Sequence, residues 1–480
     1  MNDAAGTGHS LFEMGEDFEA ITALHQRNLY ARPAGEVAEF RLRLLQARFD
    51  ALKERVGALR KLAGIQGVSA IRDLDDAVPV LFQHTVYKSY PMSLLERGRF
   101  SAMTRWLDQL TVHDLSAVDT SACTLIEHWL KALDRQTPLR CNHTTGTTGK
   151  LSFLPRTARE WRMQTRILMS GFQGIGGERD FSFDLDRPGF RVPIIQPSYR
   201  YGFYMAHRNM EEQIRLLGDP EKVECLYGDE MLSPDVLSLA GRVAAADARG
   251  ELDRLDVQPE LLERFKDSQA KMADGADRQA RFFDRIFSSY RGQQVLMGNA
   301  VPQLYQMAVE LRERGVEKVF SEDSMVISGG GLKGLDIPPD WREIIERALG
   351  AKLLLQYGMS ELCVSAPMCP RGNYHVPPYM ILYLLDEQTG EPLPRTGLAT
   401  GRAAMFDPVP DTYWGGFVTG DEITVNWDGG CACGRNGEYI LPDIRRFSDR
   451  TGQEDKISCA GAQDAQERAM EFLANEAARV

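Results

Sequence analysis

The sequence predicts an α/β protein with mostly parallel sheets sandwiched between helices, plus a small β subdomain. Three observations lead to this fold class. Between residues 136 and 330, strand-like apolar runs alternate with helix-like stretches, the order that parallel sheets require. Two further apolar runs, at 324–331 and 353–361, end in polar turns that contain glycine, as buried strands do. Short strand patterns separated by turns fill residues 376–430.

The chain before residue 136 is predicted to be mainly helical. Between residues 18 and 63, Leu, Phe and Ile recur at steps of three and four residues among Arg, Glu and Gln, which is the spacing of amphipathic helices. Residues 100–133 continue in short amphipathic segments. The predicted regions are a helical N-terminal region at 1–135, an α/β core at 136–440, and a short C-terminal tail at 441–480 with one amphipathic helix over 462–478.

Three predictions inside the core are specific enough to compare with a structure. Residues 190–195 read as a strand, which Pro193 would push to a sheet edge or into a bulge. Residues 269–287 read as one helix with basic and acidic faces. Residues 295–302 read as a strand and a turn, followed by a helix that begins at Gln303.

Composition limits the classes of function. With 480 residues, 43% of them hydrophobic, the chain can bury a large core and should hold two or three subdomains. The net charge of −12 argues against a general nucleic-acid surface, which needs a basic stripe. No apolar run reaches the roughly 18 residues of a membrane span, and no signal peptide is visible. Eight scattered cysteines in an acidic chain favour a cytoplasmic protein whose thiols bind metal or act in catalysis.

A polar loop at residues 141–152 is the most informative stretch. Gly146 and Gly149 let the backbone turn tightly and approach a ligand, and Lys150 adds a positive charge. Successive backbone N–H groups with such a lysine suit a polyphosphate. The order is not that of a P-loop, because Thr144 stands where glycine is required. A plain surface linker is the alternative. The residues expected to contact phosphate are Thr144, Thr145, Gly146, Thr147, Thr148 and Gly149.

Three later stretches place polar residues directly after apolar runs. They read Ser-Gly-Gly-Gly at 328–331, Tyr-Gly-Met-Ser-Glu at 357–361 and Gly-Phe-Val-Thr-Gly-Asp at 416–421. In parallel sheets, ligands bind beyond the carboxyl ends of strands, where these glycine-containing turns fall. A carboxylate such as Asp421 can accept both hydroxyl protons of a diol. Taken alone, residues 357–361 are equally compatible with an ordinary strand-to-helix turn.

Two short clusters contain three thiols and one imidazole, from Cys369, His375, Cys431 and Cys433. Three cysteines and one histidine are a standard structural zinc set, and ligands on two loops let one ion join distant segments. A Cys-x-Cys spacing is less specific than Cys-x-x-Cys, so free cytosolic thiols in turns are the alternative. Cys363 is a further thiol nearby that could be buried.

In this order, the polar loop, residues 357–361, the Thr-Gly-Asp stretch and the pair Gly434-Arg435 resemble the motifs of the adenylate-forming superfamily. This superfamily contains acyl-CoA ligases, luciferase-like enzymes and peptide-synthetase adenylation domains. The resemblance covers roughly residues 136–440. The Cys-Ala-Cys-Gly-Arg segment at 431–435 is similar to segments of the phenylacetate–CoA ligase branch and of the acyl-protein synthetases of bacterial bioluminescence.

The resemblance implies a fold, a reaction and cofactors. The fold would be the adenylate-forming large domain, with its C-terminal domain reduced to a short tail. The reaction would be ATP-dependent conversion of a carboxylic acid to an acyl-adenylate with release of pyrophosphate. The implied cofactors are ATP, Mg²⁺ and a structural Zn²⁺ held by the cysteine–histidine set. Lys150 and Glu361 would be catalytic, and Glu361 would also hold the Mg²⁺. The implied nucleotide contacts are Gly329, Gly330, Gly331, Tyr357, Gly358, Ser360, Asp421 and Arg435.

The acid and the acceptor are less defined. Apolar residues at 203–205 and the turn at 298–299 would line a pocket for an aryl or fatty acid, or would serve as plain core. The segment after Arg435 is too short for the mobile domain of ordinary members. The acyl-protein synthetases are similarly short and acylate a cysteine near their own C-terminus, and Cys459 occupies the comparable place. The alternative is that Cys459 is an ordinary tail cysteine without a role in the reaction.

Several alternatives remain for the acceptor and for the activity itself. The acyl group would pass to Cys459, to CoA or to a carrier protein. The chain would act as a homo-oligomer, with an acyl-processing partner, or as an adenylating subunit that leaves transfer to that partner. The alternative to an enzyme is a non-catalytic nucleotide- or partner-binding protein derived from this fold.

Overall fold

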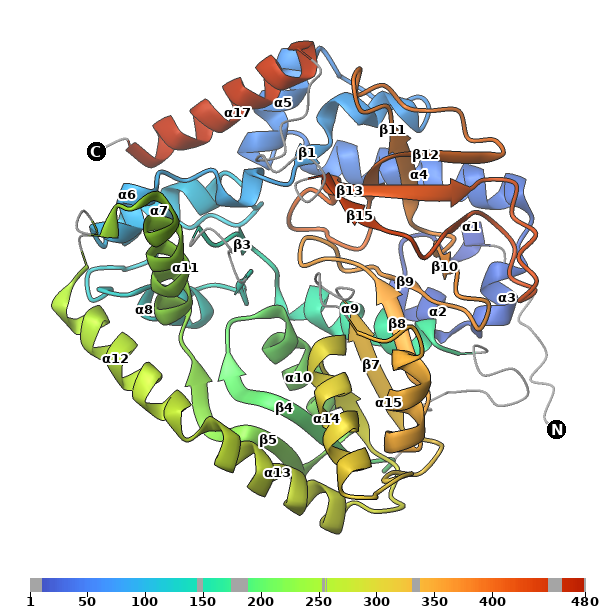
Figure 1. Cartoon of the computed structure of the whole chain (residues 1–480). Coiled ribbons are helices and arrows are strands. Elements are labelled where there is room, and N and C mark those ends of the chain that lie inside the picture. The colour runs from blue at the N-terminus through green and yellow to red at the C-terminus, as the bar shows by residue number, and fades with distance from the viewer. Residues whose placement is uncertain are drawn as a thin grey trace. The chain divides into compact units, whose positions relative to one another are not determined.

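The computed structural model describes residues 11–144, 150–173, 189–252, 255, 257–329, 337–447 and 460–478. The chain forms two compact units, and each is described by itself. Unit 1 comprises Met1–Asn142, Ser152–Asp180 and Ser360–Val480, and unit 2 comprises His143–Leu151 and Phe181–Met359. Both units contain a sheet with helices beside it (Figure 1), so the predicted α/β fold class is confirmed.

The N-terminal part of unit 1 is helical, as predicted. Its helices are α1 (Leu11–Met14), α2 (Phe18–Ala23), α3 (Gln26–Tyr30), α4 (Ala34–Leu52), α5 (Gly57–Gln66), α6 (Met92–Glu96), α7 (Phe100–Asp108) and α8 (Ile126–Gln136), with 3-10 helices η1 (Asp75–Val80) and η2 (Val86–Lys88). Helix α9 (Ala158–Gly171) follows strand β3 (Phe153–Leu154) and begins with a capping box, in which Thr157 and Glu160 satisfy each other's backbone N–H groups.

Aromatic side chains form much of the core beneath these helices. Trp106 packs edge-on against Tyr90 with a centroid separation of 5.0 Å, and Trp129 packs edge-on against Phe153 at 5.1 Å. Both indole nitrogens are satisfied, since Trp106 donates to Ser89 and Trp129 to Thr104. Buried aromatic rings with bonded polar ends are stabilising, because the ring area leaves water without stranding a donor.

The sheet of unit 1 is mixed and centred on one long strand. Its order is β10–β14–β13–β12–β11, with β1 and β15 also paired to β13. The strands are β1 (Phe82–Gln83), β10 (Tyr374–His375), β11 (Ile381–Leu385), β12 (Leu398–Phe406), β13 (Gly416–Asn426), β14 (Tyr439–Ile440) and β15 (Arg445–Arg446); β9 (Ala366–Pro367) precedes β10. Strand β1 pairs with β13 in parallel, while β12, β14 and β15 pair with it antiparallel.

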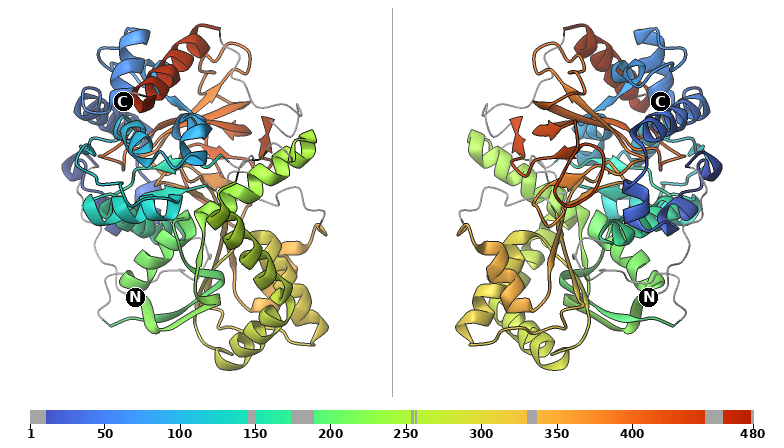
Figure 2. Two further views of the ribbon diagram at one scale, coloured as in Figure 1. Left: turned by 90° about the vertical axis from the view of Figure 1, so that its left-hand side faces the viewer. Right: turned by 90° about the vertical axis from the view of Figure 1, so that its right-hand side faces the viewer.

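The C-terminal segment ends in helix α17 (Ala460–Ala478), so the helix expected over 462–478 is confirmed. Four residues spaced by four, Ala465, Ala469, Leu473 and Ala477, are buried on one face. The small alanines let α17 lie close to α5 and α7, and Figure 2 shows it in red beside the blue N-terminal helices. Gln466 donates to the carbonyl of Leu81 at 2.8 Å, which fixes the helix along its axis.

Unit 2 contains a parallel sheet in the order β5–β4–β6–β7–β8, with helices between its strands. The strands are β4 (Val192–Gly202), β5 (Gly218–Leu232), β6 (Leu296–Gly298), β7 (Met325–Gly329) and β8 (Leu353–Tyr357). The helices are α10 (Met205–Leu216), α11 (Pro234–Arg249), α12 (Pro259–Ala273), α13 (Gly275–Ser289), α14 (Val301–Glu313) and α15 (Trp341–Leu349). Strand β2 (Asn142–His143) spans the point where the chain enters unit 2.

Two local predictions were resolved by the packing of unit 2. Strand β4 is internal, so Pro193 does not mark an edge; the register with β5 shifts between Val192 and Ile194, as a bulge at the proline requires. The single helix expected over 269–287 is wrong. It is divided into α12 and α13, with Asp274 outside both helices. Within the described ranges, none of the helices has the length and apolar character needed to span a bilayer.

Two histidines are buried in unit 2 beside the end of β4. His143 is 0% exposed, and its Nδ1 donates to the carbonyl of Thr144 at 2.9 Å. The ring of His207 fills the space beside Gly202, where an added Cβ would lie only 2.6 Å from Nδ1 of His207. Burial is the main cause that lowers the pKa of each ring, to about 4. Both rings are therefore neutral near pH 7.

We expect acid to destabilise the protein through these two rings. Their pKa is about 4 when folded, against a usual value of 6.5, so the unfolded chain binds more protons between those values. The free energy of unfolding should therefore fall as the pH drops below 6.5, by a few kcal/mol once the pH reaches about 4. His143→Gln should show a shallower fall in the denaturation midpoint over this window. His128→Gln on α8 is the control, and parallel curves for wild type and His143→Gln would contradict the prediction.

Candidate nucleotide site and metal centre

The predicted metal ligands converge in unit 1. Cys369 follows β9, His375 ends β10, and Cys431 and Cys433 lie between β13 and β14. Strands β10 and β14 are paired antiparallel, which brings the two loops together. Each loop turns tightly at a glycine, Gly372 (φ +81°) or Gly434 (φ +84°), whose N–H donates to the carbonyl of Cys369 or Cys431.

The geometry of this cluster fits a tetrahedral metal. The four ligand atoms all lie within 4.8 Å of one another. The sulfurs of Cys369 and Cys431 are 3.9 Å apart, and the sulfur of Cys433 is 3.2 Å from Nε2 of His375. The edges of a tetrahedron around zinc are about 3.8 Å between two sulfurs and about 3.6 Å between sulfur and nitrogen. The cluster is thus already close to the size that zinc requires.

The protonation of His375 and Cys431 also fits, whereas burial raises the pKa of Cys433 to about 12, so a metal would have to displace the proton of that thiol. Burial lowers the pKa of His375 to about 3, which keeps the imidazole neutral and able to bind metal. Burial raises the pKa of Cys431, but hydrogen bonds, first among them one from Asn373 Nδ2 to the sulfur at 3.4 Å, outweigh it and lower the pKa overall. Tyr30 of α3 donates to the carbonyl of His375 at 3.2 Å, so the N-terminal helices support the same loop.

Arg435 is buried beside the cysteine–histidine cluster. Its guanidinium stacks over the ring of Tyr30 at 4.6 Å and donates to the carbonyls of Gly171 and Gln173. These contacts tie the Cys-Ala-Cys-Gly-Arg segment to the C-terminal end of α9. The expected contact between Arg435 and a nucleotide stays a prediction.

Two carboxylates of the predicted nucleotide site lie in unit 1 near a common cation. Asp421 is buried on β13, and β15 places Arg446 opposite it, with 3.2 Å between Nε of Arg446 and Oδ1 of Asp421. Glu361 is half-buried, and burial raises its pKa, while Arg156, Arg446 and Lys88 act in the opposite direction. The sequence analysis missed Arg446; the doublet of basic residues at 445–446 within a charged, turn-rich segment was the available signal.

Ser360 is half-buried in unit 1, and the remaining described site residues lie in unit 2. Gly329 ends β7 and Tyr357 ends β8, and the register that pairs Gly329 with Gln356 puts both ends at one edge of the sheet. Gly358 and Lys150 are half-buried. In the expected acid pocket, Phe203 is buried, whereas Tyr204, Met205, Gly298 and Asn299 are half-buried. The predicted residues outside the described ranges are Thr145, Gly146, Thr147, Thr148, Gly149, Gly330, Gly331 and Cys459.

Two other features lie apart from this chemistry. Cys363 is buried, as expected, and its sulfur lies 3.5 Å from the hydroxyl of Tyr413.

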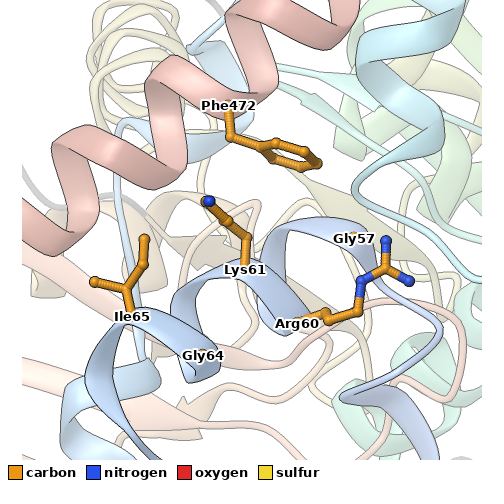
Figure 3. A pocket seen from close by; sticks show the side chains of 6 residues that line it. All are labelled: Gly57, Arg60, Lys61, Gly64, Ile65 and Phe472. Atoms are coloured by element: carbon orange, nitrogen blue, oxygen red, sulfur yellow. The ribbon is translucent and has the colours of Figure 1, made fainter.

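An open pocket of about 360 Å³ lies between α5 and α17 (Figure 3). Lys61 reaches over the ring of Phe472 there at 5.9 Å. No predicted site residue lines this pocket, so we assign it no role in the reaction.

Comparisons with known proteins bear on the fold. No family model matches the chain, and no curated protein matches it. Among solved structures, it is similar to a 2-hydroxyisobutyryl-CoA ligase in three complexes. For the open conformation with 2-HIB-AMP and CoA, the TM-score is 0.50 at 14% identity, over 86% of this chain and 70% of the ligase.

The other two complexes agree. The postadenylation state with R3-HIB-AMP gives a TM-score of 0.50 at 13% identity, over 88% of this chain and 70% of the ligase. The thioesterification state with 2-HIB-AMP and CoA gives 0.50 at 15% identity, over 88% and 71%. At such identities a match shows the fold alone, so this chain shares the fold of that ligase.

Proposed function

We propose that this protein uses ATP to activate a carboxylic acid as an acyl-adenylate and then transfers the acyl group to a thiol. The observation that carries the proposal is the placement of Asp421 and Glu361 around Arg446, since one carboxylate would bind ribose and the other the metal of the triphosphate. The fold supports it, because a ligase of the same fold is known with an acyl-adenylate and CoA.

The reaction follows from ordinary acyl and phosphoryl chemistry. A carboxylate oxygen of the acid bonds to the α-phosphorus of ATP, the bond to the β,γ-diphosphate breaks, and pyrophosphate leaves. A thiolate then bonds to the acyl carbon, and AMP leaves with the electron pair of the broken bond. Stabilisation of the transition state by positive charge that is already in place is the main source of catalysis in such steps. Lys150 of the polar loop and Arg446 are the residues proposed to supply it.

Glu361 is proposed to hold Mg²⁺. Carboxylate oxygen is a preferred ligand for this ion, which when bound would neutralise charge on the phosphates. In the ranges that the structure describes, no ion pair engages the Glu361 carboxylate, and its hydrogen-bond partner is its own backbone N–H. The nearby cations Arg156, Arg446 and Lys88 favour its ionised form.

The cysteine–histidine cluster is proposed to hold one structural Zn²⁺. Four protein ligands leave no open coordination position for substrate, so the ion would stabilise the fold and take no part in the reaction. It would tie the loop at Cys369 to the loop at Cys431, and through Tyr30 to the helical N-terminal region.

We predict that the protein catalyses ATP–pyrophosphate exchange when its carboxylic acid substrate is present, and that this exchange requires Lys150 and Glu361. Lys150→Ala or Glu361→Gln should lower the exchange rate by about 100-fold or more, since each removes charge aimed at the transition state. Asp421→Asn should mainly raise the KM for ATP, because ribose is held equally in ground and transition states. Exchange is measured with radiolabelled pyrophosphate across a panel of acids.

The controls for this experiment are Lys352→Ala and Glu391→Gln, which alter exposed residues. Near-wild-type exchange in the Lys150 or Glu361 variant would remove that residue from the mechanism. Nucleotide binding without exchange for any acid would favour the alternative, a non-catalytic protein derived from this fold.

We predict one tightly bound zinc per chain in protein purified without added metal. Cys431→Ser together with Cys433→Ser should abolish it, whereas Cys123→Ser, outside the cluster, should leave it. Chelation should lower the unfolding temperature more than it changes exchange, because metal binding is linked to folding. Elemental analysis decides the matter, and zinc-free protein that is well folded would refute the site.

The acceptor is tested by incubating the enzyme with ATP and a labelled acid, with and without CoA. If Cys459 accepts the acyl group, the protein should carry a thioester that neutral hydroxylamine releases, and Cys459→Ser should lose the label but keep exchange. A thiol in the same chain has a high effective concentration, which would make transfer fast without a mobile domain. An unlabelled protein that acylates CoA or a carrier would reduce Cys459 to a tail cysteine.

A further inference from the structure

A buried arginine and a buried aspartate lie on either side of the segment that carries Glu361. Arg156 follows strand β3 and directly precedes the N-cap of α9, and Asp407 directly follows β12. Both side chains are 0% exposed, although charged groups are rarely fully buried without specific partners. Neither residue belongs to a predicted motif, and both lie in unit 1 with the segment 360–364.

Arg156 holds the beginning of this segment. Its Nη2 donates to the carbonyl of Ser360 at 2.8 Å, and its Nε donates to the hydroxyl of Tyr413 at 3.0 Å. Its Nη1 donates to Gln164, and its guanidinium plane lies over the ring of Trp161 at 4.7 Å. The three nitrogens of the planar guanidinium reach three separated acceptors, a geometry that the single nitrogen of a lysine does not reproduce.

Asp407 holds the end of the segment. Its Oδ2 accepts the N–H groups of Cys363 and of Val364, the latter at 3.0 Å. Its Oδ1 accepts the N–H of Val409 at 2.9 Å, so both oxygens are occupied. Its own N–H donates to the carbonyl of Gly415 at 3.0 Å, and a Cβ at position 415 would come within 2.0 Å of the Asp407 carbonyl oxygen. The aspartate is thus itself fixed in place.

Between these two anchors lie only Glu361 and Leu362. Leu362 is 1% exposed and packs into the core, while Glu361 remains half-buried and without an ion pair in the described ranges. Because the segment is held at both ends and the side chain of Leu362 is in the core, the side chain of Glu361 can point in few directions. The carboxylate of Glu361 is therefore held in position before any ligand binds.

We propose that Arg156 and Asp407 are positioning residues that fix the turn 360–364 so that Glu361 meets the metal of the nucleotide without rearrangement. This inference rests on the proposed function, because it assumes that Glu361 binds the metal. Residues that orient a metal ligand contribute to affinity nearly as directly as the ligand does.

The test uses the full chain and three conservative variants. Arg156→Lys keeps the charge but loses the fork, and Asp407→Asn keeps the shape but loses one acceptor. Arg159→Lys is the matched control, since Arg159 lies three residues after Arg156, in the first turn of α9, but is exposed and pairs with Asp411. The first two should raise the Mg²⁺ concentration for half-maximal exchange about 10-fold or more. The KM for ATP in saturating Mg²⁺ and the far-UV spectrum should stay near wild type.

Two further readouts separate positioning from general stability. Hydrogen exchange of the Cys363 and Val364 amides should be about 10-fold faster in Asp407→Asn, with the rest of unit 1 unchanged. Arg156→Lys combined with Glu361→Gln should lose no more exchange activity than Glu361→Gln alone, because both act on one carboxylate.

The outcomes distinguish this inference from the proposed function. Additive losses in the double variant, or an unchanged Mg²⁺ requirement in an active enzyme, would overturn the positioning role while leaving the function intact. Unchanged amide exchange in Asp407→Asn would overturn the anchoring itself, whether or not the protein is active. A wild-type protein without exchange for any acid would refute the proposed function, and the positioning role with it.

Discussion

The pairing of strand β13 with four other strands is the constraint on which the rest of unit 1 depends. Phe417 and Val418 pair in parallel with β1 on one side and antiparallel with β12 on the other, and later residues of β13 pair antiparallel with β12, β14 and β15. Because each pairing uses backbone hydrogen bonds, the register is shared by segments more than 300 residues apart in sequence. The positions of Asp421, Arg446 and the Cys431 loop all follow from that one register.

Unit 1 also buries several charged side chains, and their partners explain why it tolerates them. Glu160 caps α9 and accepts two N–H groups and a hydroxyl from Asp411 and Thr412, which joins α9 to the loop before β13. Arg156 and Asp407 bond the turn at 360–364 in the same way. A buried charge is costly unless it is paired and hydrogen-bonded, so these groups restrict each loop to one conformation. Precise loops are what a nucleotide site needs.

Local sequence patterns predicted well those helices and strands whose positions depend on the residues of the segment itself. The strands that end at Gly329 and Tyr357 and the C-terminal helix all appear near their predicted places. The ambiguity at Pro193 could not be resolved locally, because an edge strand and a bulge look alike until the neighbouring strands are known. The break at Asp274 was missed because helix periodicity continues on both sides of it.

The sequence by itself determined the fold class and the chemical types of the site, because periodicity, glycine-containing turns and metal-ligand residues are local properties. It also singled out Cys369, His375, Cys431 and Cys433 as candidate metal ligands, although not the distances between them. Only the tertiary structure decided which distant groups meet: Arg446 with Asp421, Arg435 with Tyr30, and Arg156 with the carbonyl of Ser360. Each of these contacts joins segments that are far apart in sequence, so no local sequence pattern predicts it. The contacts form because strand pairing and burial bring those segments together.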